Sequence, residues 1–105
     1  MSQVLVIKVD GEKRASAIFI DHLDIIFFAS EEQKIAVHTK SERFFLPNSL
    51  EDCTLLDGFE RIDRCYIART EQISHYDKNL QLLHFKGTDK RCYVSNTHRK
   101  RLNLK

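Results

Sequence analysis

The stretch GFERIDRCYIARTEQI, Gly58 to Ile73, joins a cluster of charges to an apolar run. Arg61 and Arg64 flank the acid Asp63, and the run CYIA (residues 65–68) follows them directly. Tyrosine and isoleucine favour β-strands, so we expect a strand here with charged side chains at its entrance. The same strand then adds another cation, Arg69.

Alternation of apolar and polar residues extends outward from this stretch in both directions. The runs with period two are Val4–Asp10, Ala15–Asp21, Lys34–Thr39, Arg43–Pro47, Cys65–Ala68, Gln81–Phe85 and Arg91–Val94. Period two is the signature of half-buried strands, and the breaks DGEK, SEEQ and KSE have the length of hairpin loops. The sequence therefore predicts a mostly β fold of small antiparallel sheets.

One segment, NSLEDCTLLDG (Asn48–Gly58), breaks this alternation and has the marks of a short helix. Asn48 or Ser49 can serve as N-cap, and Gly58 can end the helix. A second helical turn is expected at THRKRLN, residues 97–103.

Length and composition indicate one globular domain over residues 1–105. The chain has 42% hydrophobic and 30% charged residues, which is typical of a folded domain with a modest core. Its longest apolar run, Ile25–Ala29, is far shorter than the roughly 20 residues of a membrane helix. The start of the chain lacks the features of a signal peptide. We therefore expect a cytoplasmic protein without a membrane partner.

Residue types that carry catalysis or bind metals are scattered. Cys53, Cys65 and Cys92 form no CxxC pair, which predicts reduced thiols rather than disulfides or a zinc site. The five histidines have no ligand spacing, and three glycines are too few for a phosphate-binding loop. We expect no catalytic residues, no metal and no cofactor, and hence no enzyme.

Charge is concentrated at the C-terminal end, although the net charge of the chain is only +2. Residues 86–105 contain seven lysines and arginines against the single acid Asp89, a local balance of +6 that leaves −4 for the rest. Such an asymmetry is typical of a surface that meets a polyanion. A solvated basic tail would have the same composition, so charge alone leaves both interpretations open.

The charged stretch carries a resemblance to a known family. The matching residues are Phe59, Arg61, Ile62, Arg64, Tyr66 and Ile67. This pattern resembles the LytTR-type DNA-binding domain, whose motif there runs Phe-x-Arg-Ile-His-Arg-Ser-Tyr-Ile-Val-Asn. HLDIIFFAS and FFLPNSLEDC upstream, and the hairpin-like QISHYDKNLQLLHFKGTDKRCYVSN downstream, are also similar to the family. The resemblance spans about Ile18 to Leu104.

The resemblance implies a mostly β fold whose loops at one edge enter the major groove of double-stranded DNA. Family members form the output half of bacterial transcription regulators, often behind the receiver domain of a two-component response regulator, and bind paired repeat sites. We expect a monomer in solution that pairs on DNA. If Met1 and Lys105 are natural ends, regulation would fall to concentration or to a regulatory protein partner; in an excised output domain it would fall to the receiver.

The resemblance also assigns DNA-binding residues in three loops. Arg64 takes the place of the family's loop arginine and is expected to contact a base or the backbone, while Arg61 packs on Phe59 or binds phosphate. In the first loop, Gln33 and Lys34 can read a base or hold phosphate. The third loop contributes Asn96, Thr97, Arg99, Lys100 and Arg101.

Departures from the family pattern leave alternatives open. Asp63 replaces a histidine, and it can hold Arg64 by an ion pair, weaken DNA binding, or accept a hydrogen bond from cytosine. The arginine expected after Ser95 is missing, and the first loop carries Glu31 and Glu32. A second hypothesis is therefore a protein-interaction module that kept the fold and lost specific DNA binding.

Overall fold

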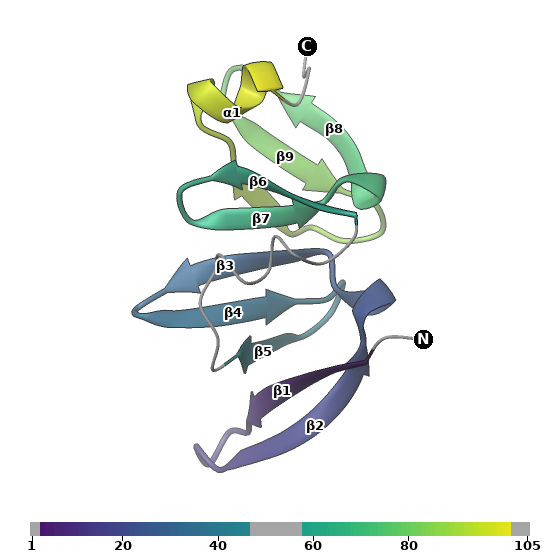
Figure 1. Cartoon of the computed structure of the whole chain (residues 1–105), viewed down its shortest axis with the longest axis vertical. Helices are drawn as coiled ribbons and strands as arrows, with labels where there is room; N and C mark the ends of the chain where they lie inside the picture. Colours follow the sequence, from purple (N-terminus) through teal and green to yellow (C-terminus); the bar gives the residue numbers. More distant parts are fainter. Residues whose placement is uncertain (1–2, 47–57, 102–105) are drawn as a thin grey trace.

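The computed structural model describes residues 3–46 and 58–101, without the side chain of Arg101 (Figure 1). The strands in these ranges are β1 (Gln3–Val9), β2 (Ala15–Asp21), β3 (Phe27–Glu31), β4 (Lys34–His38), β5 (Arg43–Leu46), β6 (Phe59–Asp63), β7 (Tyr66–Arg69), β8 (Ile73–Asp77), β9 (Leu82–Phe85) and β10 (Arg91–Tyr93). Two 3₁₀ turns, η1 (His22–Asp24) and η3 (Thr70–Gln72), and the helix α1 (Asn96–Arg101) complete them.

The strands form two sheets in which every pair is antiparallel. The larger sheet has seven strands in the order β2-β1-β5-β4-β3-β7-β6, and the smaller one has the order β10-β9-β8. The predicted mostly β fold with antiparallel sheets is thus confirmed, as is the helical turn near the C-terminus. The helix expected over Asn48–Gly58 lies outside the described residues, apart from Gly58 itself.

One strand was missed because a bulge hides its pattern. We expected Arg61 and Arg64 at the entrance of a strand starting at Cys65, but Phe59–Asp63 is itself strand β6 and residues 64–65 form a hairpin turn. The register of β6 against β7 shifts between Arg61 and Asp63. This shift buries both Phe59 and Ile62, three residues apart, and so destroys the period of two on which the prediction rested.

Strand β3 explains why the run IIFFA is apolar without interruption. Phe28 belongs to a core cluster on one face of the large sheet, with Val37, Phe44 and Ile67. Phe27 belongs to a second cluster on the opposite face, where its ring stacks on Phe85 of the small sheet at 5.2 Å between centroids. Because both faces of β3 are covered, consecutive residues of this strand are buried.

The small sheet covers only part of the large one. Figure 1 shows β8 and β9 at the β6–β7 end, whereas the β1–β2 hairpin lies at the other end. The cross-strand partners Leu5 and Phe19 on this hairpin are accordingly 46% and 64% exposed. None of the helices in the described ranges is long and apolar enough to cross a membrane.

A buried arginine connects β7 to two other elements. The side chain of Arg69 is only 3% exposed, and its Nε donates to the carbonyl oxygen of Ile25 at 2.9 Å while Nη2 donates to that of His22. Its guanidinium lies 4.4 Å from the centroid of the Phe59 ring. Backbone carbonyls and an aromatic face thus solvate a charge that burial would otherwise penalise.

Gly58 adapts the backbone to this arginine. Its φ of +86° is in the left-handed region, which glycine adopts without strain. A Cβ at this position would lie 3.4 Å from Nη1 of Arg69. The backbone carbonyl of Gly58 accepts from Thr70 at 3.1 Å, which ties the start of β6 to the end of β7.

We expect Arg69→Met to lower the free energy of unfolding by about 2–4 kcal/mol, since methionine fills similar space but removes the donors to two carbonyls. Urea unfolding followed by circular dichroism measures this loss. Arg14→Met is the matched control because the Arg14 side chain is 80% exposed and forms an ion pair with Glu12, which is 74% exposed; it should change stability by less than about 0.5 kcal/mol. Equal stabilities of the two variants would contradict the structural role of Arg69.

Candidate nucleic-acid interface

The β6–β7 turn is braced from within by Arg61. Nη1 of Arg61 donates to the carbonyl oxygens of Asp63 at 3.3 Å and of Arg64 at 3.0 Å. Oδ2 of Asp63 accepts from the backbone N–H of Cys65 at 3.1 Å. The side chains of Arg61 and Asp63 are therefore engaged in holding the turn, whereas Arg64 is exposed.

Arg64 is exposed, and within the described residues no ion pair joins it to Asp63. The Asp63 carboxylate instead accepts from the Cys65 amide, and the two alternatives that concern DNA stay predictions. Arg61 was expected to pack on Phe59 or to bind phosphate; in the structure its guanidinium bonds the turn, and that of Arg69 lies over the Phe59 ring. Sequence spacing does not show which arginine bonds the turn and which lies over Phe59, because this depends on the bulge in β6.

The β3–β4 turn presents Gln33 at its tip. Glu32 and Gln33 have φ values of 47° and 68°, the backbone of a two-residue hairpin turn with positive φ at both positions. Gln33 and Lys34 are both exposed, and the Nζ of Lys34 lies above the Phe45 ring at 5.4 Å from its centroid. Lys34 thus covers the sheet face, and Gln33 is the predicted reader that projects from the turn.

The acid nearest this turn is compensated inside the protein. Glu31 contacts Nε2 of His38 at 3.1 Å and Nη1 of Arg43 at 3.2 Å. Burial lowers the pKa of His38 more than its hydrogen bond to Glu31 raises it, so the imidazole is neutral at pH 7 and donates through Nε2. The charge of Glu31 is therefore balanced by Arg43, and Glu32 remains as the exposed acid of the turn.

The third predicted segment begins where β10 leads into α1. The carbonyl of Ser95 accepts from the N–H of Arg99 at 2.9 Å, and its Oγ accepts from the N–H of His98 at 3.4 Å, so Ser95 is the N-cap of the helix. Asn96, Thr97 and Lys100 are exposed on α1, and Arg99 is half-buried. Arg101 ends the helix.

Two residues that we did not predict contact this segment. Nε2 of Gln81 donates to Oδ1 of Asn96 at 2.6 Å, and the hydroxyl of Tyr93 donates to Oε1 of Gln81 at 2.9 Å. These contacts span 15 and 12 residues of sequence, so no local pattern signals them.

Backbone hydrogen bonds bring the three segments to one edge. The N–H of Ser30, beside the β3–β4 turn, donates to the carbonyl of Cys65 in the β6–β7 turn at 2.8 Å. The N–H of Ser95 donates to the carbonyl of Ile62 at 3.3 Å. In Figure 1 both turns lie on the left, with α1 above them. The structure thus places the predicted loops side by side, as a common interface requires.

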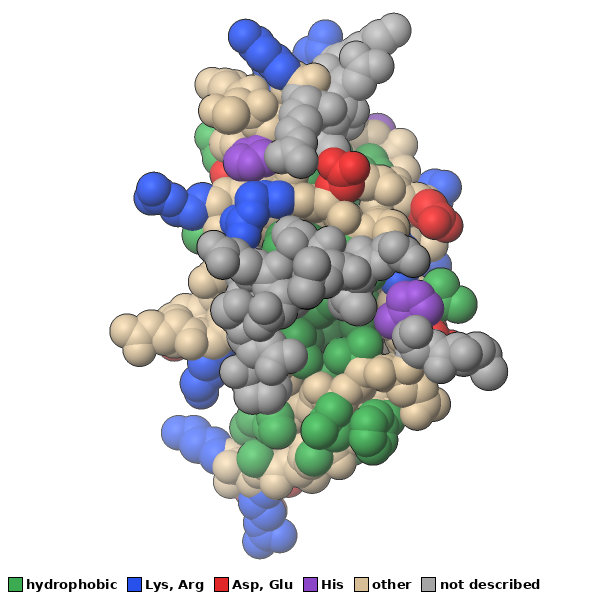
Figure 2. Space-filling view, in the orientation of Figure 1, with side chains coloured by type: hydrophobic (Ala, Val, Ile, Leu, Met, Phe, Trp, Pro, Cys, Tyr) green, Lys and Arg blue, Asp and Glu red, His purple; other side chains and the backbone are tan. Residues whose placement is uncertain are grey.

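Positive side chains follow this edge. Figure 2 shows Lys and Arg side chains along the left-hand edge, where the two turns lie, and above α1, while the Asp and Glu side chains visible on the upper part lie mostly toward the middle and right. Arg64 and Lys100 are exposed cations of this region. A row of cations on one edge can follow a phosphate backbone.

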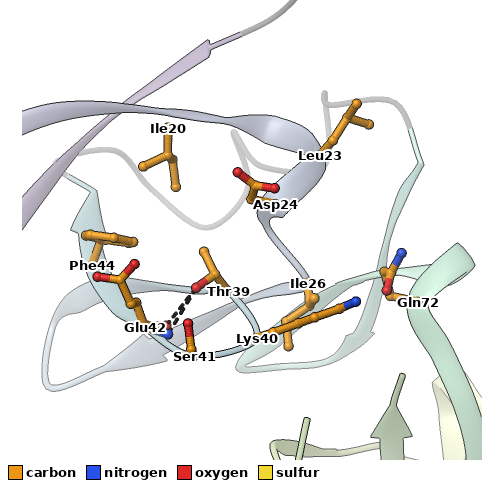
Figure 3. A pocket seen from close by; sticks show the side chains of 10 residues that line it. All are labelled: Ile20, Leu23, Asp24, Ile26, Thr39, Lys40, Ser41, Glu42, Phe44 and Gln72. Atoms are coloured by element: carbon orange, nitrogen blue, oxygen red, sulfur yellow. Dashed lines mark hydrogen bonds between the residues drawn. The ribbon is translucent and has the colours of Figure 1, made fainter. Parts of the chain in front are cut away.

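One pocket lies away from these turns. A pocket of about 330 Å³ is bordered by η1, by the turn between β4 and β5, and by η3 (Figure 3). Its polar groups partly satisfy one another, since Oγ1 of Thr39 accepts from the N–H of Glu42 at 3.0 Å. In residues 3–46 and 58–101 no group of three or more His, Cys, Asp or Glu side chains could hold a metal ion.

We expect Arg61→Met to loosen the β6–β7 turn, because the carbonyls of Asp63 and Arg64 lose their donor. Hydrogen exchange of the Cys65 amide, measured by NMR, should accelerate by roughly tenfold, which corresponds to about 1.4 kcal/mol of local stability. Arg64→Met is the matched control in the same turn and should leave this amide unchanged. Identical exchange in both variants would show that Arg61 does not brace the turn.

Two comparisons with known proteins agree with this geometry. Residues 15–105 match the LytTR family, described as the LytTr DNA-binding domain. A solved structure, the LytTr DNA-binding domain of a putative methyl-accepting/DNA response regulator from Bacillus cereus, superposes with a TM-score of 0.79 at 21% identity, over 98% of this chain and 94% of that one. No curated protein sequence matches the chain. The family match covers most of the sequence, and the chain therefore belongs to the LytTR family of DNA-binding domains.

Proposed function

We propose that this domain binds double-stranded DNA in a sequence-specific manner through the three segments at its edge, and that it acts as the output part of a cytoplasmic transcription regulator in bacteria. The observation that carries this proposal is the pair of backbone hydrogen bonds, Ser30 to Cys65 and Ser95 to Ile62, that unites the segments. Membership of a DNA-binding family supports it. Residues 1–105 would supply this function as one domain.

Each exposed side chain has a role in this proposal. Arg64 can donate two parallel hydrogen bonds to O6 and N7 of guanine, and Gln33 can pair with adenine. Thr97, Lys100, Arg99 and Arg101, together with Lys34, would hold phosphates and fix the register of the protein on the duplex. Arg61 and Asp63 shape the turn that carries Arg64, and we propose no direct base contact for them.

We propose that the protein is a monomer in solution and that two copies pair on repeated DNA sites. The exposed apolar side chains of the β1–β2 hairpin, Leu5, Val9 and Phe19, are 46%, 43% and 64% exposed. Three partly exposed side chains supply far less than the roughly 800 Å² per partner of a stable interface. Sedimentation velocity at micromolar concentration should give one monomeric species, and a dimer there would refute this expectation.

A protein-interaction module without specific DNA binding is the second candidate. The exposed Glu32 beside Gln33 favours it, because a carboxylate at a reading turn repels phosphate. Either function is compatible with a regulatory protein partner. Selection from random duplex DNA separates the two: an enriched pool supports the DNA-binding proposal, and an unenriched pool supports the interaction module.

We expect Arg64→Ala to cost about 1–3 kcal/mol on the selected site and to relax specificity at one position, because the guanidinium fork reads one base. Arg64→Lys keeps the charge and loses the paired donors, so it should relax specificity in the same way. Competition binding on the selected site and on its single-base variants measures both changes.

Lys100→Ala is the matched control for Arg64→Ala, since it removes one exposed cation that would contact phosphate. It should weaken all sequences alike and reduce the slope of log K against log salt by about 1. For the unaltered protein this slope should be about −4 to −5 if four to six phosphates are neutralised. Arg64 variants that bind every sequence like the original protein would place the reading residue elsewhere.

A further inference from the structure

A chain of three hydrogen-bonding side chains ends at the interface. It starts at Tyr93 of β10, passes through Gln81 in the turn before β9, and ends at Asn96, the first residue of α1. The distances are 2.9 Å from Tyr93 Oη to Gln81 Oε1 and 2.6 Å from Gln81 Nε2 to Asn96 Oδ1. Side chains from three separate elements thus converge on one exposed amide.

The backbone holds Gln81, the middle of these three side chains, in place. Gln81 has a φ of 56°, and its carbonyl oxygen accepts from the N–H of Val94 at 2.9 Å. This bond joins the residue to the end of β10, one position after Tyr93. Gln81 is half-buried, so its amide has fewer competing water partners than the exposed Asn96.

The two hydrogen bonds run in one direction, from Tyr93 through Gln81 to Asn96. Oε1 of Gln81 carries no hydrogen, so the Tyr93 hydroxyl must be the donor to it. The amide of Gln81 therefore turns its NH₂ group toward Asn96, whose Oδ1 accepts. Oδ1 keeps one further acceptor position, whereas Nδ2, the end of the amide that makes no bond to Gln81, is a donor only.

Asn96 lies next to the proposed reading turns. The residue before it, Ser95, donates its N–H to the carbonyl of Ile62, two positions before Arg64. Asn96 is exposed, so Nδ2 is accessible to a ligand at this edge. The base edge that best fits a donor is that of guanine, which offers the acceptors N7 and O6 in the major groove.

We propose that Tyr93 and Gln81 are positioning residues that fix Asn96 as a hydrogen-bond donor, so that the third segment selects guanine rather than a base that presents an amino group. This inference rests on the proposed DNA binding and adds the base class that the third segment prefers. A free asparagine would instead pair with adenine, using its oxygen and its nitrogen together. Here Gln81 already fills one of the two acceptor positions of Oδ1, which favours donation through Nδ2 over that paired contact.

Gln81→Glu reverses the hydrogen bond to Asn96 with little change in the shape of the side chain at position 81. A carboxylate only accepts, so it would take hydrogens from both Tyr93 and Nδ2 of Asn96. Asn96 would then present Oδ1 as an acceptor, and the preference at one position of the site should change from guanine to cytosine or adenine, whose amino groups donate. Asn96→Asp, which is also an acceptor only, should produce the same exchange. We expect each change to reverse the preference by about tenfold.

Two controls separate this exchange from charge and folding. Asn79→Asp adds a negative charge to the same β8–β9 turn without touching the chain, and it should weaken all sequences alike. Tyr93→Phe keeps the ring and removes the hydroxyl, which frees the Gln81 amide to rotate, so discrimination at that position should decrease without a new preference. Amide NMR spectra of each variant establish that it is folded.

The experiment is selection from random duplex DNA, followed by competition binding at fixed salt. A changed base at a single position with Gln81→Glu and Asn96→Asp, and not with Asn79→Asp, is the expected result. If the original protein selects a site and both variants keep its preferences, the inference is overturned while the proposed function stands. If the original protein selects no site, the proposed function fails, and the inference fails with it.

Discussion

The buried guanidinium of Arg69 is the constraint on which the arrangement of the large sheet depends. A charge with 3% exposure persists only where donors and acceptors match, and here the carbonyls of Ile25 and His22 and the ring of Phe59 provide that match. These partners belong to the segment that enters β3 and to β6, so the arginine fixes β7 between its two neighbours. Strand β7 pairs with β3 from Ala68 opposite Phe27 to Tyr66 opposite Ala29.

The pairing of these strands also sets the positions of the turns at their opposite end. Because β3 pairs with both β4 and β7, the β3–β4 turn and the β6–β7 turn must emerge at the same edge. The hydrogen bond from Ser30 to Cys65 closes the gap between them. A rigid sheet behind two short turns limits their motion, and this favours direct reading of base edges over adaptive contact.

Electrostatics at this edge depends on which charges are already paired. Glu31 is balanced by Arg43 and hydrogen-bonded to His38, and Asp63 accepts from a backbone amide. A count of acids and bases in the sequence therefore does not show which charges at the edge are exposed and unpaired. Arg61 is a cation that the count includes, yet its guanidinium serves the turn. Exposed Arg64 and Lys100 remain available to an anionic partner.

The sequence by itself determined the fold class, the hairpins and the family. Period-two runs such as Ala15–Asp21 became strands with the predicted bounds, and the pattern around Phe59 and Tyr66 indicated the LytTR family before any coordinates. Local patterns suffice for these features because strand periodicity and turn composition act over a few residues. The placement of Gln33 in a hairpin loop also followed from them, whereas the loop position of Arg64 came from the family resemblance.

Tertiary structure decided which side chains are free to act. In the structure Arg61 bonds the β6–β7 turn and Arg69 lies over the Phe59 ring, whereas the sequence left Arg61 to that ring or to phosphate. The contacts from Tyr93 and Gln81 to Asn96 depend on how β10, the β8–β9 turn and α1 meet. Hydrogen-bond partners that are distant in the chain are chosen by packing, and packing is a property of the whole fold that no short stretch of sequence encodes.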